Sequence, residues 1–215
     1  MSENNHILAV LFALLLFCSS VTAFAKDPTY LTDDELWSIT TEVGELYDIS
    51  PALLFALVET ESSKNVYAEN GSHKGLCQIS TKWHKDRMET LGVENVFDPY
   101  GNVLTCADYL SELLGIAKKR GCEKEIEYAL MRYNMATDTA NEMYDRGEVS
   151  KYAKKVTKRA EELEEDARKW AAQEEIKETL TRLTQVREDG NPSDCLMPMG
   201  GIAHLYTAVL SVGDR

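Results

Sequence analysis

The stretch PALLFALVETES, residues 51–62, decides the fold class of this chain. Ser50 and Pro51 are residue types favoured at a helix N-cap and in a first helical turn. The apolar run that follows predicts an α-helix that ends near Ser62 and carries Glu61 close to its end.

Further helices are predicted on both sides of this stretch. Residues 32–35, Thr-Asp-Asp-Glu, form a capping-box pattern that opens a helix to about Tyr47. Asp98-Pro99 starts another helix, whose apolar positions recur at helical spacing: Val103, Ala107, Leu110 and Leu114. Helices are also expected over 126–133 and from 149 onward, with a long loop over 63–80. Since no strong alternating pattern is present, the expected domain is mainly α.

Three short motifs follow Glu61-Ser62 along the chain: Gly75-Leu-Cys-Gln-Ile79, Asp98-Pro-Tyr-Gly-Asn-Val103 and Tyr133-Asn134. Their order and spacing resemble the catalytic frame of the lytic transglycosylases with a lysozyme-like (SLT-type) fold, over about residues 45–157. Those enzymes cut the glycan strands of bacterial peptidoglycan with one carboxyl group and without a metal or cofactor. The resemblance therefore implies an enzyme that acts on peptidoglycan.

The cleavage of a glycosidic bond needs a carboxylic acid that is still protonated near neutral pH, and an apolar site favours that state. Glu59 and Glu61 each share a helical stripe with apolar residues of the 51–62 helix, so helix geometry alone does not choose between them. The resemblance favours Glu61 as the catalytic residue, because the family's catalytic glutamate is followed directly by serine.

No second carboxylate is a convincing partner for Glu61. Asp98 is better explained as a helix cap, and Glu69, Asp86 and Asp108 lie in polar surroundings. A hydrolytic muramidase commonly uses such a partner. In a transglycosylase the 6-hydroxyl of the muramic acid attacks instead and closes a 1,6-anhydro ring. The expected reaction is therefore cleavage of the MurNAc-GlcNAc β-1,4 bond by a single acid/base, with a muramidase on the same fold as the alternative.

The resemblance also implies which residues contact substrate: Ser62, Gln78, Tyr133 and Asn134. Gln78 is expected to hydrogen-bond sugar hydroxyl or N-acetyl groups, and Tyr133 to orient Glu61. Asn134 is expected to hold the local backbone or to contact substrate. Tyr152 matches the family as the aromatic residue near the start of the closing helix.

Two of the five cysteines replace residues that are usual in the family. Cys77 stands where Met is common, and Cys106 stands where Gly is common. Two such changes are explained together by one disulfide, so a Cys77–Cys106 bridge is expected.

Other classes of function are compatible with single residues. Cys77 with His73 or His84 would suit a cysteine hydrolase, and the same three residues are conceivable zinc ligands, although their spacing lacks paired ligands. A non-catalytic adaptor that kept the cleft is a further alternative. Retention of Glu61, Gln78 and the tyrosine of the third motif argues against it.

Residues 1–25 are expected to form a signal peptide, because an apolar run over 7–17 precedes Ala23-Phe-Ala25. The alternative is an uncleaved N-terminal anchor. Both predict an exported protein, extracellular or associated with the cell wall. The net charge of −13 argues against nucleic acid as a partner.

The expected organisation is a lysozyme-like domain over 26–157, a charged helix over 158–188 and an unassigned tail over 189–215. Apolar residues recur along 151–187, and either a short coiled coil or a stripe that folds back on the domain would explain them. The few and broken heptads favour folding back. The chain also resembles small transglycosylases of mobile elements in Gram-positive bacteria, which implies a secretion or conjugation apparatus as a further partner.

Overall fold

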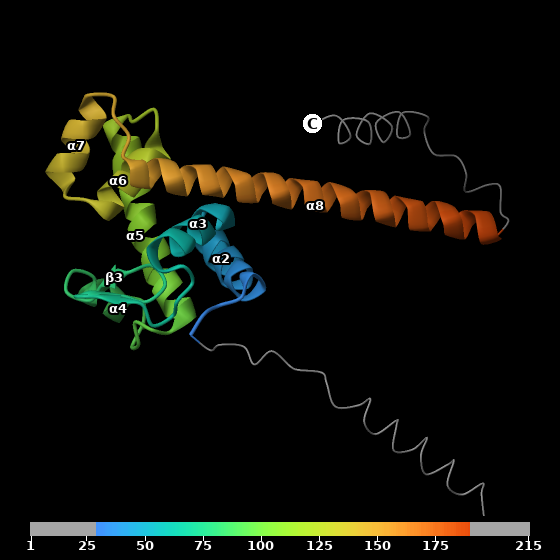
Figure 1. The fold of residues 1–215 in the computed structure, drawn as a ribbon, viewed down its shortest axis with the longest axis horizontal. Helices are drawn as coiled ribbons and strands as arrows, with labels where there is room; N and C mark the ends of the chain where they lie inside the picture. Colours follow the sequence, from blue (N-terminus) through green and yellow to red (C-terminus); the bar gives the residue numbers. More distant parts are fainter. Residues whose placement is uncertain (1–28, 190–215) are drawn as a thin grey trace, which may run out of the picture.

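The computed structural model describes residues 29–189, with side chains as far as residue 182. The helices of this part are α2 (Asp33–Tyr47), α3 (Pro51–Ser62), α4 (Lys85–Thr90), α5 (Pro99–Arg120), α6 (Glu125–Asn134), α7 (Thr137–Asp145) and α8 (Lys151–Asp189). The strands are β1 (Glu69–Asn70), β2 (His73–Lys74) and β3 (Ile79–Ser80), which form an antiparallel sheet in the order β1-β2-β3. The expected mainly α class is confirmed. A rounded body holds α2 to α7, and α8 projects from it (Figure 1).

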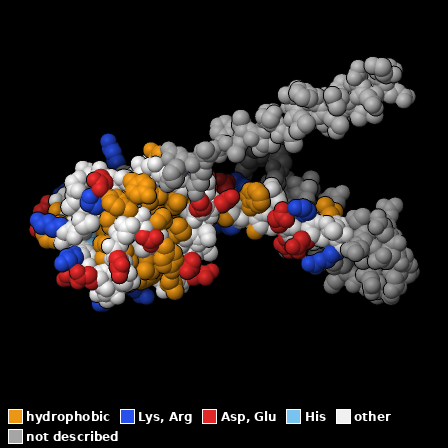
Figure 2. Space-filling view, turned by 90° about the horizontal axis from the view of Figure 1, so that it is seen from below, with side chains coloured by type: hydrophobic (Ala, Val, Ile, Leu, Met, Phe, Trp, Pro, Cys, Tyr) orange, Lys and Arg blue, Asp and Glu red, His pale blue; other side chains and the backbone are white. Residues whose placement is uncertain are grey.

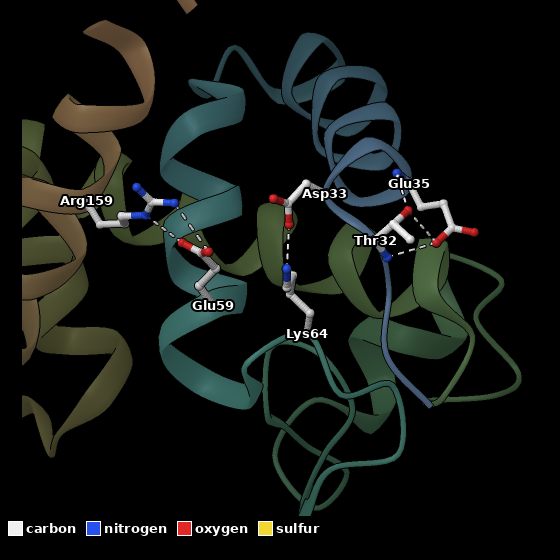
Figure 3. Close-up of polar contacts among 6 residues, drawn as sticks. All are labelled: Thr32, Asp33, Glu35, Glu59, Lys64 and Arg159. Carbon is white, nitrogen blue, oxygen red and sulfur yellow. Dashed lines mark hydrogen bonds and ion pairs between the residues drawn. The ribbon is translucent and has the colours of Figure 1, made fainter. Parts of the chain in front are cut away.

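The predicted capping box opens α2 (Figure 3). The Thr32 amide donates to a Glu35 carboxylate oxygen at 2.9 Å, and the Glu35 amide donates to the Thr32 hydroxyl at 3.3 Å. Two amides that would otherwise lack partners at the start of the helix are thereby satisfied. The helix has the predicted bounds and ends at Tyr47.

Helix α3 lies at the centre of the body and packs against α2 and α8. Residues 52–58 are all buried, as the apolar run predicts. Ser50 precedes the helix as expected, but its side chain does not cap it. Its hydroxyl donates instead to Glu164 on α8 at 2.7 Å, so tertiary contact replaced the local hydrogen bond.

The predicted long loop over 63–80 contains the small three-stranded sheet. Each strand has two residues, which is too short for a pattern of alternating polarity to show. Helices α4 and α7 were not predicted either, since they are short and bury one residue between them, Ala140.

Helix α5 begins where Asp98-Pro99 predicted. The Asp98 carboxylate accepts the amide of Gly101 at 2.7 Å, and the proline occupies the first turn. The helix packs against α6 and α2 through the predicted stripe, of which Val103 and Leu110 are fully buried.

Helix α8 has two parts. Its first part lies on the body, where the apolar stripe as far as Leu163 is buried. Beyond Glu164 the helix extends away, with Trp170 70 % and Leu180 58 % exposed (Figure 1). Figure 2 shows hydrophobic side chains over the body and mixed acidic and basic side chains along the projecting part. The prediction that the apolar stripe folds back on the domain is therefore correct for the first part of α8, as far as Leu163, and wrong for the part beyond it.

The predicted boundary between residues 157 and 158 falls inside this continuous helix. The predicted signal peptide and C-terminal tail lie outside the described residues, apart from Asp189 at the end of α8. Within 29–189, no helix combines the length and the apolar composition needed to cross a bilayer.

Candidate active site

Glu61 lies in the last turn of α3, where the buried helix meets the start of α8. The hydroxyl of Tyr152, in the first turns of α8, donates a short hydrogen bond to the carboxylate of Glu61. Residues far apart in the chain are thus brought together, and the carboxyl group is held in one orientation.

Burial raises the pKa of Glu61 above its usual value. The Tyr152 hydrogen bond opposes this rise, as do the charges of His73 and Lys155. A carboxyl group in an apolar environment favours its neutral form, so Glu61 keeps a proton at higher pH than an exposed glutamate does. It therefore has the property that a general acid needs.

The structure separates Glu61 from its neighbour Glu59. The Glu59 carboxylate forms an ion pair with Arg159 of α8, with an N–O distance of 2.7 Å (Figure 3). The Glu59 carboxylate is therefore engaged in a contact between α3 and α8.

Other carboxylates of the body are engaged elsewhere. Asp98 caps α5, Glu69 pairs with Lys74 at 2.6 Å, and Asp108 pairs with Arg87. Each of these three acidic groups is therefore occupied by a partner other than Glu61.

Gln78 has a structural role in the loop that carries it. Its backbone adopts a left-handed conformation with φ 50°. Its side-chain amide donates to the carbonyl oxygens of Ala68 and Gly75 at 3.1 and 3.0 Å. The side chain also lines the cavity described below, where its contact with substrate stays a prediction.

Tyr133 was expected to lie near Glu61 and to orient it. Burial raises the pKa of Tyr133, and Glu61 is near enough to raise it further. The Tyr133 hydroxyl, however, donates to the backbone carbonyl of Cys77 at 2.7 Å, and the hydroxyl that donates to Glu61 belongs to Tyr152. Sequence reasoning matched Tyr152 to the family but assigned it no role. The tyrosine that orients the acid is decided by where α8 crosses α3, and this crossing has no local signal in the sequence.

Two further residues of the expected set lie close by. The Ser62 hydroxyl donates to the Val58 carbonyl at 3.3 Å, inside its own helix. Asn134, exposed at the end of α6, lines the cavity together with Gln78 and Tyr133. The structure therefore brings Gln78, Tyr133 and Asn134 to one surface, as the motifs implied.

Asn102, buried in the first turns of α5, fastens the loop to the helix. Its side-chain oxygen accepts the amide of Cys77 at 2.8 Å, and its nitrogen donates to Lys74 and Val96 carbonyls at 3.1 and 2.7 Å. Gly75 passes so close that an added Cβ would lie 2.3 Å from the Asn102 nitrogen. The motifs around residues 75–79 and 98–103 are therefore complementary parts of one contact.

A cavity of about 360 Å³ lies beside these residues. Its walls are formed by His73, Gln78, Ile79, Ser80, Trp83, His84, Tyr109, Arg132, Tyr133, Asn134, Met135 and Ala136. Sequence reasoning missed Trp83, Tyr109 and Arg132, which come from different elements. Trp83, a few residues after the Gly75–Ile79 motif, was a signal available in the sequence.

The predicted Cys77–Cys106 disulfide is not formed, and this expectation is corrected. Both residues are free thiols, as is Cys122. The side chains of Cys77 and Cys106 are neighbours that hydrogen-bond to one another, and the Tyr133 hydroxyl lies 3.5 Å from the Cys106 sulfur. Cys77 and Cys106 therefore do pack as a pair, as expected, but their contact is between two buried thiols and is not covalent.

This environment also argues against the alternatives built on Cys77. Burial raises the pKa of its thiol well above the usual value, which disfavours the thiolate that a nucleophile or zinc ligand must supply. The His84 ring packs at a tilt against Tyr109, with ring centroids 4.4 Å apart. The described residues hold no cluster of side chains suited to a metal ion.

The family of the chain follows from comparison with known proteins. The model of the transglycosylase SLT domain matches residues 39–156, more than half of the chain. The chain therefore belongs to this family of peptidoglycan-cleaving transglycosylases. The match ends within the part of α8 that lies on the body, and it includes Glu61, all three motifs and Tyr152.

Proposed function

We propose that the protein is a lytic transglycosylase that cleaves the MurNAc-GlcNAc β-1,4 bond of peptidoglycan with Glu61 as its single acid and base. The observation that carries this proposal is one partly buried carboxyl group at the end of α3 that accepts a hydrogen bond from Tyr152 and whose pKa is raised by desolvation.

In the first step, Glu61 donates its proton to the glycosidic oxygen as the bond to the anomeric carbon breaks. The departing GlcNAc leaves with a free 4-hydroxyl, and the muramic acid acquires oxocarbenium character. Glu61 is then a carboxylate, which the Tyr152 hydroxyl and the nearby charges of His73 and Lys155 favour.

In the second step, the 6-hydroxyl of the muramic acid attacks its own anomeric carbon. The Glu61 carboxylate takes the hydroxyl proton as the new C–O bond closes the 1,6-anhydro ring. The proton balance is restored and no water is consumed. Because the nucleophile is tethered to the substrate, it reacts with a proximity advantage over water.

The muramidase alternative is less favoured by the same geometry. A retaining or inverting hydrolase places two carboxyl groups on opposite sides of the scissile bond, roughly 5 to 9.5 Å apart. The acidic groups Asp98, Glu69 and Asp108 are occupied by a helix amide and by cations. Cyclisation needs no such second group.

Action on peptidoglycan requires that the protein reach the cell wall. We therefore propose export directed by residues 1–25, as a cleaved signal peptide or as an anchor. A secretion or conjugation apparatus as partner stays a proposal from sequence resemblance, and the projecting part of α8 is the element it would concern.

The proposal is tested by digesting purified peptidoglycan with the protein that begins at Lys26 and analysing the released muropeptides by mass spectrometry. We expect products one water lighter than reducing-end muropeptides. Glu61→Gln should abolish them, because the amide cannot donate the proton, whereas Glu59→Gln should retain them.

Each other result has a definite meaning. Reducing-end products would establish a muramidase. Full activity of Glu61→Gln would reject the assignment of the acid. Absence of cleavage by the unaltered protein would favour the non-catalytic adaptor.

A further inference from the structure

The cavity next to the Glu61 site has an unusual charge for this protein. The whole chain carries a net charge of −13, yet none of the residues that line the cavity is acidic. Arg132, His73 and His84 are in its wall. The cavity therefore presents one permanent positive charge, on Arg132, while burial lowers the pKa of His84 and so favours its neutral form.

Arg132 differs from the other arginines of the body in its partners. Ion pairs to carboxylates engage Arg87, Arg120, Arg146 and Arg159. Within residues 29–182 no ion pair joins Arg132 to a carboxylate. Its guanidinium has therefore lost part of its hydration without gaining a protein counter-charge.

The hydrogen bonds of Arg132 also leave donors free. One terminal nitrogen donates to the Tyr128 hydroxyl at 3.4 Å, and that hydroxyl in turn donates to Asn141 at 2.5 Å. The buried Nε of Arg132 has no acceptor in the described part of the chain. A guanidinium has five N–H donors. Because Nε is enclosed, the donors that a ligand could reach are those of the two terminal nitrogens, one of which already contacts Tyr128.

The cavity is connected to the proposed catalytic group. Tyr133 belongs to its wall, where burial raises the pKa of its hydroxyl and Glu61 is near enough to raise that pKa further. His73, also in the wall, acts electrostatically on Glu61. Trp83, which is 74 % exposed, adds a large apolar ring to the same wall. A glycan strand bound over Glu61 would therefore extend into the cavity.

We propose that this cavity binds a carboxylate of the peptidoglycan strand through Arg132. The inference rests on the proposed function and names a part of its substrate. A planar guanidinium matches a carboxylate with two parallel hydrogen bonds, whereas neutral sugar hydroxyls need no such charge. Peptidoglycan offers this group on the stem peptide. In strands whose stem peptide has been removed, it is offered instead by the lactyl ether of muramic acid, because its carboxyl is no longer held in the amide bond to the peptide.

The test compares cleavage of three glycan substrates by the unaltered protein and by Arg132→Gln. The first substrate is intact strands, the second is strands stripped of stem peptides by an amidase, and the third is strands whose carboxylates are coupled to methylamine. Arg120→Gln is the matched control, because Arg120 also lies over the Tyr128 ring but does not line the cavity. Urea unfolding of all variants checks that they remain folded.

We expect Arg132→Gln to lower kcat/KM on intact strands roughly tenfold, the usual effect of losing a hydrogen bond to a charged group. On methylamide strands the two proteins should be equal, and Arg120→Gln should match the unaltered protein throughout. A ratio that falls to one on stripped strands assigns the stem peptide. A tenfold ratio on both kinds of strand means that the site also accepts the lactyl carboxylate that the amidase frees. An equal loss on methylamide strands, or no loss on intact ones, overturns the inference.

Binding separates this inference from the proposed function. The disaccharide GlcNAc-MurNAc, with and without its stem peptide, lacks the bond that would be cleaved, so its affinity is measurable by NMR titration whether or not the protein is an enzyme. We expect weaker binding by Arg132→Gln and by the methylamide forms. Unchanged affinity in both cases would overturn the carboxylate site even if cleavage by Glu61 is established.

Discussion

At the scale of single residues, the site depends on Glu61, whose surroundings disfavour the charged form of its carboxyl group. Glu61 ends an apolar helix, and burial raises its pKa. The same burial that makes the group a usable acid destabilises its charged form in the folded protein. Function and stability are therefore opposed at this position.

A comparison of Glu61→Gln with the unaltered protein exposes this opposition. A folded-state pKa raised above the ordinary value of 4.5 means that the folded protein binds more protons than the unfolded chain just above that pH. Stability is then fully present below pH 4.5 and is lost as the pH rises through the folded-state pKa. Since glutamine carries no charge, Glu61→Gln should be the more stable protein at neutral pH, with the advantage absent in acid.

Urea unfolding at a series of pH values measures the effect. Glu59→Gln is the control, and it should instead lose up to about 1 kcal/mol at neutral pH because it breaks the ion pair with Arg159. A gain in the free energy of unfolding of Glu61→Gln that is the same at every pH would show that the gain does not come from removing a buried charge.

Tyr152→Phe tests the orientation of the acid. The hydrogen bond from Tyr152 lowers the pKa of Glu61, so its loss should raise that pKa. Because the proposed mechanism needs a protonated Glu61 in the free enzyme, the alkaline limb of kcat/KM should move to higher pH. We also expect kcat to fall roughly tenfold as the carboxyl group loses its fixed position.

The control for this variant is Tyr144→Phe. The Tyr144 hydroxyl accepts the Lys124 amide at 3.1 Å, away from the cavity. Tyr144→Phe should change neither the alkaline limb of kcat/KM nor the value of kcat. A limb that stays in place in Tyr152→Phe would assign the pH dependence to another group.

At the scale of elements, α8 is one continuous helix whose two parts make different contacts. Its first turns supply Tyr152 and bury Val156 and Leu163 against the body. Its outer part has mainly exposed side chains with ion pairs within the helix, such as Lys169 with Glu165 at 2.9 Å. Surface pairs of this kind contribute little to stability, so the two parts should differ in how much the domain depends on them.

Truncation of the chain distinguishes the two parts. A protein that ends at Asp166 keeps every α8 residue that is buried on the body, and we expect its stability to change by less than about 0.5 kcal/mol and its activity to be retained. A protein that ends at Ser150 loses Tyr152 and exposes the core, so it should be inactive and largely unfolded. Thermal unfolding and muropeptide release measure both. Loss of activity in the protein that ends at Asp166 would show that the part of the chain after Asp166 is needed for catalysis.

At the scale of the whole molecule, three cysteines are enclosed in the folded body. Cys77 is 1 %, Cys106 0 % and Cys122 7 % exposed, and all three are free thiols. Reagents reach such groups only when the structure opens. Thiol reactivity therefore reports on global unfolding as well as on the redox state.

Ellman titration of the protein that begins at Lys26 and carries Cys195→Ser checks this arrangement. Without reductant, we expect slow reaction of the folded protein and three thiols after unfolding, one for each of the buried cysteines. A single thiol in the unfolded protein would show that Cys77 and Cys106 had formed the bridge after all. Addition of reductant provides the reference value.

Local sequence patterns predicted the parts of the fold that depend on nearest neighbours. The capping box at Thr32, the Pro51 start of α3 and the Asp98 cap of α5 all act within one or two turns of a helix. The order of the motifs, with glutamate and serine at the end of α3, was sufficient to indicate the family. These features can be predicted from the sequence because their physical cause lies within a few residues.

Only the tertiary structure decided which side chains meet. It placed Tyr152 rather than Tyr133 on Glu61, used Ser50 to contact α8, and left the paired cysteines reduced. It also assembled the cavity around Arg132 from β2, β3, α5, α6 and the segments beside them. Such contacts depend on how helices cross and on what each buried group finds near it, and no short stretch of the chain encodes that geometry by itself.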